Sequence, residues 1–222
     1  QADLTDTSTA AQNITVADVA TITLGLGSDT TGTDAIVATA LTDGDVLTLT
    51  GANDATISFD EGDITASAYT GALTVTGTGT AGQFTTGTAS SSISSTGTTA
   101  IVATALADGQ TLTTTGNGAL TIPGLQANLA VNDARSAAHS VTAVDVANLT
   151  IAMGTSTSGT DTIVATALTD GQVLTLTGSN STNLSFANAD ITASTFVGAL
   201  AVTGSGTTGQ FTTGTKSSSI SS

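Results

Sequence analysis

The chain has 222 residues, of which 39% are hydrophobic, 3% are aromatic and none is cysteine. Two basic residues against 17 acids give a net charge of −15, which leaves no basic footprint for nucleic-acid binding. Disulfides are excluded as a source of stability, and no apolar run is long enough to insert into a membrane.

Short strands are predicted along most of the chain. Apolar residues alternate with Thr, Ser or Gly, as in half-buried strands. The clearest runs are ATITLGL at 20–26, DVLTLTG at 45–51, ATISF at 55–59, ALTVTGTG at 72–79, GQFTT at 82–86 and SSSISS at 90–95. Clusters such as GAND at 51–54 and DEGD at 60–63 separate these runs, so we expect tight turns between the strands.

One stretch departs from the alternating pattern. Residues 125–140 (LQANLAVNDARSAAHS) show a weak helical periodicity and contain the only arginine and the only histidine, Arg135 and His139. We expect a loop or a short helix there.

An internal repeat is the dominant feature of the sequence, and repeats of this kind decide the fold class. Residues 33–95 align without gaps on residues 160–222, at an offset of 127, and about three-quarters of the positions are identical. We expect a first repeat unit over residues 1–125 and an incomplete second unit over residues 126–222. The second unit stops about three-quarters of the way through, which predicts further copies in the full-length polypeptide.

Each unit divides further into halves. The hexapeptide IVATAL starts at Ile36, Ile101 and Ile163, which predicts half-unit boundaries near residues 31 and 96. A half-unit of roughly 63 residues is too short for a sandwich domain of the immunoglobulin type, at about 100 residues.

The fold expected from these patterns is all-β, a parallel β-solenoid (β-helix) built from tandem repeats. Rungs of roughly 20 residues, three per half-unit, would give about 11 rungs stacked at about 4.8 Å. Small side chains suit this fold because like residues stack rung upon rung. Tandem β-sandwich domains are the alternative, although the Trp, Tyr and Pro-rich turns usual in sandwich domains are scarce.

Two aspartates point to calcium. GTDAIV at 32–37 and GTDTIV at 159–164 place Asp34 and Asp161 two residues before the aliphatic residues Ile36 and Ile163. These segments resemble the back half of the calcium-binding nonapeptide of RTX proteins, in which an Asp and the turn carbonyls hold calcium between rungs. The resemblance implies calcium at Asp34 and Asp161. The middle copy has Thr99 at this position and the leading glycines are missing, so ordinary turn residues are the alternative.

A second candidate calcium site is the acidic turn made by Asp60, Glu61 and Asp63, since calcium prefers hard oxygen ligands. The second unit keeps only Asp190 of the three acids.

With no cysteine and one histidine, zinc sites and Ser-His or Cys-His nucleophile systems lack their parts. We therefore expect no enzymatic activity.

The Thr/Ala/Gly-rich style of residues 64–88 is similar to the strands of S-layer and giant bacterial surface proteins with RTX-like β-helices. This resemblance implies an extracellular or cell-surface structural protein whose repeats self-associate into a filament, sheath or surface layer. The alternative is an adhesin stalk, or a module that binds a glycan or a protein on its flat Thr-rich faces.

Overall fold

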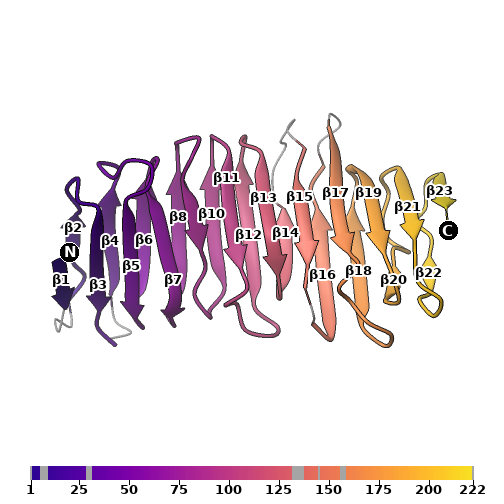
Figure 1. The fold of residues 1–222 in the computed structure, drawn as a ribbon, viewed down its shortest axis with the longest axis horizontal. Helices are drawn as coiled ribbons and strands as arrows, with labels where there is room; N and C mark the ends of the chain where they lie inside the picture. Colours follow the sequence, from indigo (N-terminus) through magenta and orange to yellow (C-terminus); the bar gives the residue numbers. More distant parts are fainter. Residues whose placement is uncertain are drawn as a thin grey trace.

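The computed structural model describes residues 2–5, 10–28, 32–131, 138–144, 146–155 and 159–221. In this part of the chain there is no helix, and 23 strands form two sheets of 12 and 11 strands. Every strand pair is parallel, and consecutive strands alternate between the sheets, so the chain coils into one elongated β-solenoid (Figure 1). The predicted solenoid is confirmed. The sandwich alternative is wrong, because sandwich domains are built from antiparallel sheets.

The odd-numbered strands form one sheet, here called sheet A. They are β1 (Ala2–Thr5), β3 (Thr21–Leu26), β5 (Val46–Gly51), β7 (Asp63–Tyr69), β9 (Gln83–Thr85), β11 (Thr99–Ala103), β13 (Leu120–Leu125), β15 (Ser140–Ala143), β17 (Thr160–Ala165), β19 (Ser181–Phe186), β21 (Leu200–Gly204) and β23 (Ser218–Ser221).

The even-numbered strands form sheet B. They are β2 (Asn13–Thr15), β4 (Thr33–Ala38), β6 (Asp54–Phe59), β8 (Leu73–Gly77), β10 (Ser91–Ser95), β12 (Thr111–Gly116), β14 (Asn128–Val131), β16 (Asn148–Met153), β18 (Val173–Gly178), β20 (Asp190–Thr192) and β22 (Phe211–Thr212).

The core lies between the two sheets and is made of stacked aliphatic columns. Ile36, Ile57, Val75 and Ile93 are register partners on successive strands of sheet B, and all four are buried. On each strand, the residues directly before and after these core residues point outward, because side chains alternate along a strand. The period-2 pattern of the sequence therefore specifies which residues line the core.

Glycine makes the tight turn that follows each IVATAL copy possible. In the first copy the Asp45 N–H donates to the Thr42 carbonyl oxygen at 3.0 Å, and Gly44 between them has φ +88°. A positive φ at the third residue of a β-turn defines type II and favours glycine. The same turn recurs at 107–110 and 169–172, with Gly109 at φ +79° and Gly171 at φ +82°.

The stretch 125–140 contains strands where a loop or short helix was expected. Leu125 ends β13 and residues 128–131 form β14, which pairs with β12 and β16. Residues 132–137, including Arg135, lie outside the described residues. The helical periodicity is misleading because Leu129 and Val131 face the core as alternate residues of a strand.

The 127-residue repeat contains an odd number of strands. Its offset carries β4 onto β17, 13 strands further along the chain, which is six and a half turns of the solenoid. Equivalent strands of the two units therefore lie in opposite sheets. The register is the same in both: Ile36 pairs with Ile57 in sheet B, and Ile163 pairs with Leu184 in sheet A.

The three IVATAL copies lie on β4, β11 and β17, so they are three and a half and then three turns apart. Turn length varies around the expected 20 residues: register partners are 17 residues apart at Leu47 and Ile64 but 25 apart at Ile22 and Leu47. The sheets run without a break across the predicted unit boundary at 125/126, through the pairs β12–β14 and β13–β15.

Candidate functional site

The first candidate ligands, Asp34 and Asp161, point into the solenoid. Asp34 is 0% exposed and Asp161 is 1% exposed. Asp34 Oδ1 accepts a hydrogen bond from the Gln12 N–H at 2.9 Å, and its Oδ2 accepts one from Asn53 Nδ2 at 3.3 Å. The carboxylate thus links three successive rungs, since Gln12 lies one turn before it and Asn53 one turn after.

The second unit repeats this arrangement on the opposite sheet. Asp161 Oδ1 accepts from the His139 N–H at 2.9 Å, and its Oδ2 accepts from Asn180 Nδ2 at 3.1 Å. In both units the carboxylate accepts hydrogen bonds from N–H groups of the neighbouring rungs, so it has a structural role in holding the rungs together. Among the described residues, Asn53 Oδ1 and Asn180 Oδ1 have no hydrogen-bond partner, although both amides are buried.

The hydroxyl group beside each asparagine comes from a different residue in each unit. In the first unit the Tyr69 hydroxyl donates to the Asn53 carbonyl oxygen. Burial, with added repulsion from the charges of Asp34 and Asp54, raises the pKa of Tyr69 above its usual range. In the second unit Phe196 replaces Tyr69.

There the Thr182 hydroxyl takes over and donates to the Asn180 carbonyl oxygen at 3.3 Å. Ala55 is the counterpart of Thr182 in the first unit. Both units therefore satisfy the same carbonyl group by different side chains.

The middle copy has neutral side chains in place of the buried aspartate. Thr99 takes the place of the aspartate and is 2% exposed. Its hydroxyl lies 2.8 Å from the Ser95 hydroxyl, and that hydroxyl donates to the Gly97 carbonyl oxygen at 2.9 Å. A buried hydroxyl pair thus replaces the charged group at the same place in the fold.

The acidic turn at 60–63 also bonds to the next rung. Glu61 accepts hydrogen bonds from the N–H groups of Thr80 at 3.1 Å and Ala81 at 2.9 Å. Asp63 Oδ1 accepts from the Gln83 N–H at 3.0 Å, and Asp60 Oδ1 accepts from the Thr78 hydroxyl at 3.0 Å. The three carboxylates therefore serve three different places on the following rung.

The second unit keeps this pattern without the cluster of charges. Asn188 replaces Glu61 and accepts from the Thr207 N–H at 3.1 Å, and Asp190 accepts from the Gln210 N–H at 3.1 Å. The oxygen acceptor is retained at two of the three positions, while Ala187 replaces Asp60 at the third. In the described part of the chain, no three His, Cys, Asp or Glu side chains gather closely enough to hold a metal ion. Calcium at these five residues stays a prediction.

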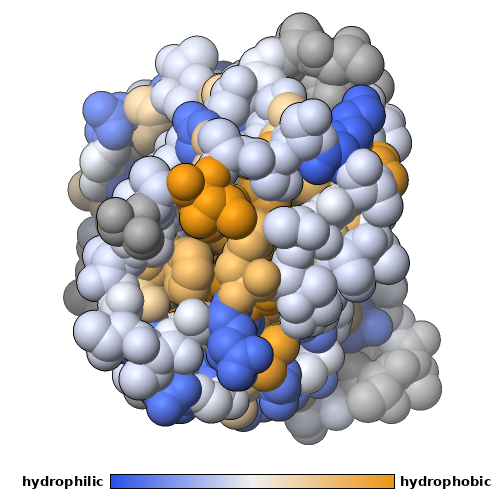
Figure 2. Space-filling model, turned by 90° about the vertical axis from the view of Figure 1, so that its right-hand side faces the viewer, coloured by the Kyte–Doolittle hydropathy of each residue, from blue (hydrophilic) through white to orange (hydrophobic). Residues whose placement is uncertain are grey.

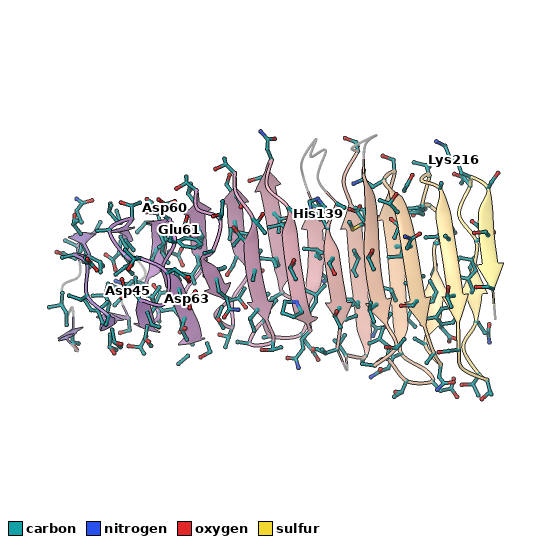
Figure 3. The ribbon with its side chains drawn as sticks, turned by 45° about the horizontal axis from the view of Figure 1, so that its top comes forward. Asp45, Asp60, Glu61, Asp63, His139 and Lys216 are labelled. Carbon is teal, nitrogen blue, oxygen red and sulfur yellow. The ribbon has the colours of Figure 1, made fainter. Side chains whose placement is uncertain are left out.

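Asp45 closes the turn after the first IVATAL copy. Its Oδ2 accepts from the N–H and from the hydroxyl of Thr42, both at 2.8 Å. These bonds, the backbone bond first, hold the pKa of Asp45 below its ordinary value. Gln172 makes the equivalent bond in the second unit, from the Thr169 N–H to its Oε1 at 2.7 Å. Figure 3 labels Asp45 together with Asp60, Glu61 and Asp63 near the N-terminal end of the rod.

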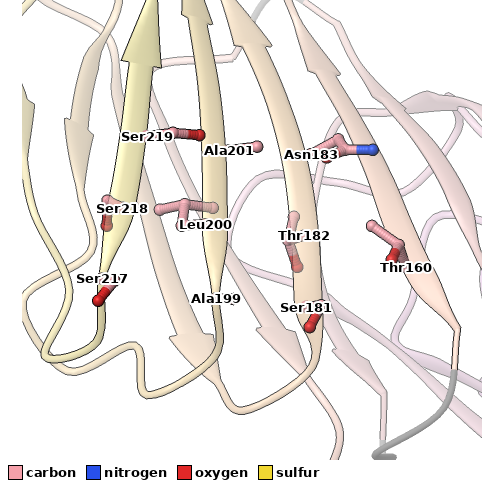
Figure 4. A pocket seen from close by; sticks show the side chains of 10 residues that line it. All are labelled: Thr160, Ser181, Thr182, Asn183, Ala199, Leu200, Ala201, Ser217, Ser218 and Ser219. Carbon is pink, nitrogen blue, oxygen red and sulfur yellow. The ribbon is translucent and has the colours of Figure 1, made fainter.

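A shallow depression lies over β17, β19, β21 and β23 (Figure 4). Its lining side chains are small and uncharged: Thr160, Ser181, Thr182, Asn183, Ala199, Leu200, Ala201, Ser217, Ser218 and Ser219. None of them is an acid, a base or a good metal ligand, so the depression offers shape and hydroxyl groups but no group for acid–base catalysis.

Columns of hydroxyl groups cover the outer faces of the sheets. On sheet B, Ser58, Thr76 and Ser94 are register partners on β6, β8 and β10. Their counterparts in the second unit, Ser185, Thr203 and Ser221, form the same column on sheet A. The sequence predicts Thr-rich faces but not the register that forms these columns. The Asn53 and Asn180 amides are hidden in GAND at 51–54 and its counterpart GSNS at 178–181, which have the composition of plain turns.

The end of the rod at β22 and β23 exposes apolar surface. Figure 2 shows apolar side chains in the middle of this end, surrounded by polar ones. Ile220 on β23 is 57% exposed, whereas its counterpart Ile93, which lies between β8 and β12, is 0% exposed. Among the described strands, none covers Ile220 as β12 covers Ile93.

Comparisons of the chain with protein-family models, curated proteins and solved structures gave no significant match. Within the described residues, no helix has the length and apolar character needed to cross a membrane.

Proposed function

We propose that this protein is an extracellular structural repeat protein whose β-solenoid units assemble into a filament, sheath or surface layer. The observation that carries the proposal is the equal register of the two units, because it makes each unit an extension of the one before it. Length is then set by the number of units, since each repeat contacts only its neighbours.

Stacking of rungs along the axis has a physical basis, whether the next rung belongs to the same chain or to another copy. Edge strands present unpaired N–H and C=O groups that accept another strand. At β23 the exposed Ile220 adds an apolar contribution, since covering its counterpart Ile93 with β12 buries that side chain completely. A further rung of the same kind therefore gains both hydrogen bonds and apolar burial.

Electron microscopy of the purified protein tests this proposal. Rods longer than one chain, or layers made of parallel rods, are the expected result, and calcium chloride and a chelator form the two arms of the experiment. Single solenoids at every concentration, in both arms, contradict the proposal. Sodium chloride at equal ionic strength is the control. Stronger assembly in calcium chloride than in sodium chloride supports calcium at Asp34, Asp161 or the acidic turn.

The second candidate function is binding of a glycan or protein on the hydroxyl faces, as in an adhesin stalk. The column of Ser58, Thr76 and Ser94 favours it, because hydroxyl groups repeat there with the spacing of the strands. A glycan array separates the two functions: selective binding by single solenoids favours the adhesin, whereas self-association without glycan binding favours the structural protein.

A further inference from the structure

The odd strand number of the repeat has a consequence for the surface of the rod. Moving one unit along the chain advances six and a half turns, or about 31 Å at about 4.8 Å per rung, and rotates the unit by half a turn. Every feature of the unit is then shown alternately on sheet A and on sheet B. A rod that shows each feature on the same sheet in every unit would need an even number of strands in its repeat.

The hydroxyl column is the surface feature that this alternation duplicates. Ser58, Thr76 and Ser94 lie on sheet B, and Ser185, Thr203 and Ser221 lie on sheet A. In the neighbouring outward column the second unit carries Asn183, Ala201 and Ser219, visible side by side in Figure 4. All nine side chains are small and uncharged, so the two faces are chemically alike.

The acids lie toward the edges of the sheets. Asp60 and Glu61 lie in a turn, and Asp63 and the exposed Asp54 are the first residues of β7 and β6, with Asp54 four residues before Ser58 on the same outward side. The columns themselves can therefore approach without contact between like charges, while the acids in the turns and at the strand starts repel one another through the solvent. Because the Debye length is about 10 Å at 0.1 M salt, this repulsion falls as the ionic strength rises.

Beyond the columns the outward residues of sheet A stay small, as at Thr48, Thr65 and Thr85 on β5, β7 and β9, and the whole face is large enough for a stable interface. Sheet A has 12 strands; with about 4.8 Å between strands and about 3.3 Å per residue along roughly five residues, its face covers about 900 Å². Two such faces bury about 1,800 Å² in total, within the range of stable protein–protein interfaces. Small side chains on facing sheets interdigitate into a dry interface, as in steric zippers.

We propose that the hydroxyl faces of this rod pack against the hydroxyl faces of a second copy of the chain, and that both sheets do so. The inference rests on the proposed structural function, and it assigns the surface through which the rods associate laterally. A patch that pairs with itself on one side gives a closed dimer, but the same patch on both sides lets rods add laterally into a layer. The aromatic side chains among the core residues are buried, which leaves these faces without the aromatic surface common in ligand sites.

Lysine substitutions at one position of the column, in each sheet, test the proposal. Thr76 and Thr203 are exposed equivalents on sheets B and A. Ala40 and its counterpart Ala167, exposed in the turns after β4 and β17, provide the double control A40K/A167K of equal charge change. Sedimentation velocity over a concentration series at about 0.15 M salt is the measurement, with circular dichroism to verify the fold.

The expected result is that the natural sequence associates beyond dimers and that the control A40K/A167K does the same. T76K and T203K each stop at dimers, and the double variant T76K/T203K stays a single solenoid in width. If the double variant does not fold, S94K/S221K tests the same two columns. A folded double variant that associates like the natural sequence overturns the inference, as does a natural sequence that never widens.

Electron microscopy separates this outcome from failure of the proposed function. Long rods one solenoid wide, formed by the double variant but not by the natural sequence, support the lateral faces. The same narrow rods from the natural sequence overturn the lateral faces and leave end-to-end assembly intact. No assembly by the natural sequence in any direction overturns both.

Discussion

Asp34 and Asp161 make the same pair of hydrogen bonds on opposite sheets of the solenoid. Each accepts a backbone N–H from the previous rung and an asparagine amide from the next one. A buried carboxylate is costly unless its hydrogen bonds are satisfied. The two aspartates therefore act first as links between rungs, whatever else they bind.

Replacing Asp34 by alanine is expected to destabilise the solenoid more than replacing it by asparagine. D34A removes the acceptor of the Gln12 N–H and of the Asn53 amide, at about 1–3 kcal/mol for each buried donor. D34N keeps one oxygen, and rotation of the Asn53 amide turns its own oxygen toward the new NH₂ group. Urea unfolding measures both variants.

The second unit supplies the matched pair, D161A and D161N. The same order of stability is expected there, because the geometry is the same. Equal losses for the alanine and asparagine variants would show that the charge, rather than the hydrogen bonds, is the stabilising feature.

Replacing Tyr69 by phenylalanine is expected to cost about 1–3 kcal/mol, because the Asn53 carbonyl loses a buried hydrogen bond. Adding A55T to Y69F should recover part of this loss, since Thr182 serves the equivalent carbonyl beside Phe196. A double-mutant cycle in urea measures the coupling between the two positions. A Y69F/A55T protein less stable than Y69F would contradict the exchange of hydroxyl donors.

Much of the fold follows from the sequence, for reasons visible at particular residues. Alternation fixes which side of a strand faces the core, so Leu73 and Val75 were expected inside. The repeat also predicts that the same turn recurs in both units, because a type II turn favours glycine at positions such as Gly44 and Gly171. Small stacked residues favoured rungs over sandwich domains.

What the sequence does not show directly is which sheet a strand enters. This depends on the number of strands in between, and short ones such as β2 and β9, of three residues each, have little signature. The half-turn between units is therefore invisible in the alignment of 33–95 on 160–222. The inward direction of Asp34 was also missed, since an aspartate before an apolar pair is typical of an exposed turn.

Alanine substitutions at two glycines are expected to differ sharply. A Cβ atom on Gly51 would lie 1.6 Å from the Leu26 carbonyl oxygen, and the residue has φ +118°. A Cβ atom on Gly44 would meet nothing within 4 Å, so only its φ of +88° opposes the change. We expect a loss of about 1–2 kcal/mol for G44A and unfolding of the surrounding rungs for G51A.

Hydrogen exchange of the amides in β3 and β5 locates the effect of G51A. The second unit provides G178A and G171A as replicates, since a Cβ atom on Gly178 would lie 1.7 Å from the Met153 carbonyl oxygen. Similar stability of G44A and G51A would contradict the close approach of the rungs at this corner.

Acid is expected to weaken the turn at Asp45 selectively. Because hydrogen bonds from Thr42 place the folded-state pKa of Asp45 below its ordinary value of 3.8, the ionised form is bound more tightly in the folded protein. The contribution to stability is then full above pH 3.8 and is lost as the pH falls through the folded-state pKa. Titration of the Asp45 carboxyl carbon by NMR measures this pKa directly.

The variant D45Q copies Gln172, which accepts the same turn N–H without a charge. Its free energy of unfolding should depend less on pH below pH 3.8 than that of the natural sequence. The matched control is D43Q, which removes one charge from the neighbouring turn position without removing the acceptor of the Thr42 N–H. If D45Q and D43Q change the acid dependence equally, net charge rather than the turn hydrogen bond governs the acid response.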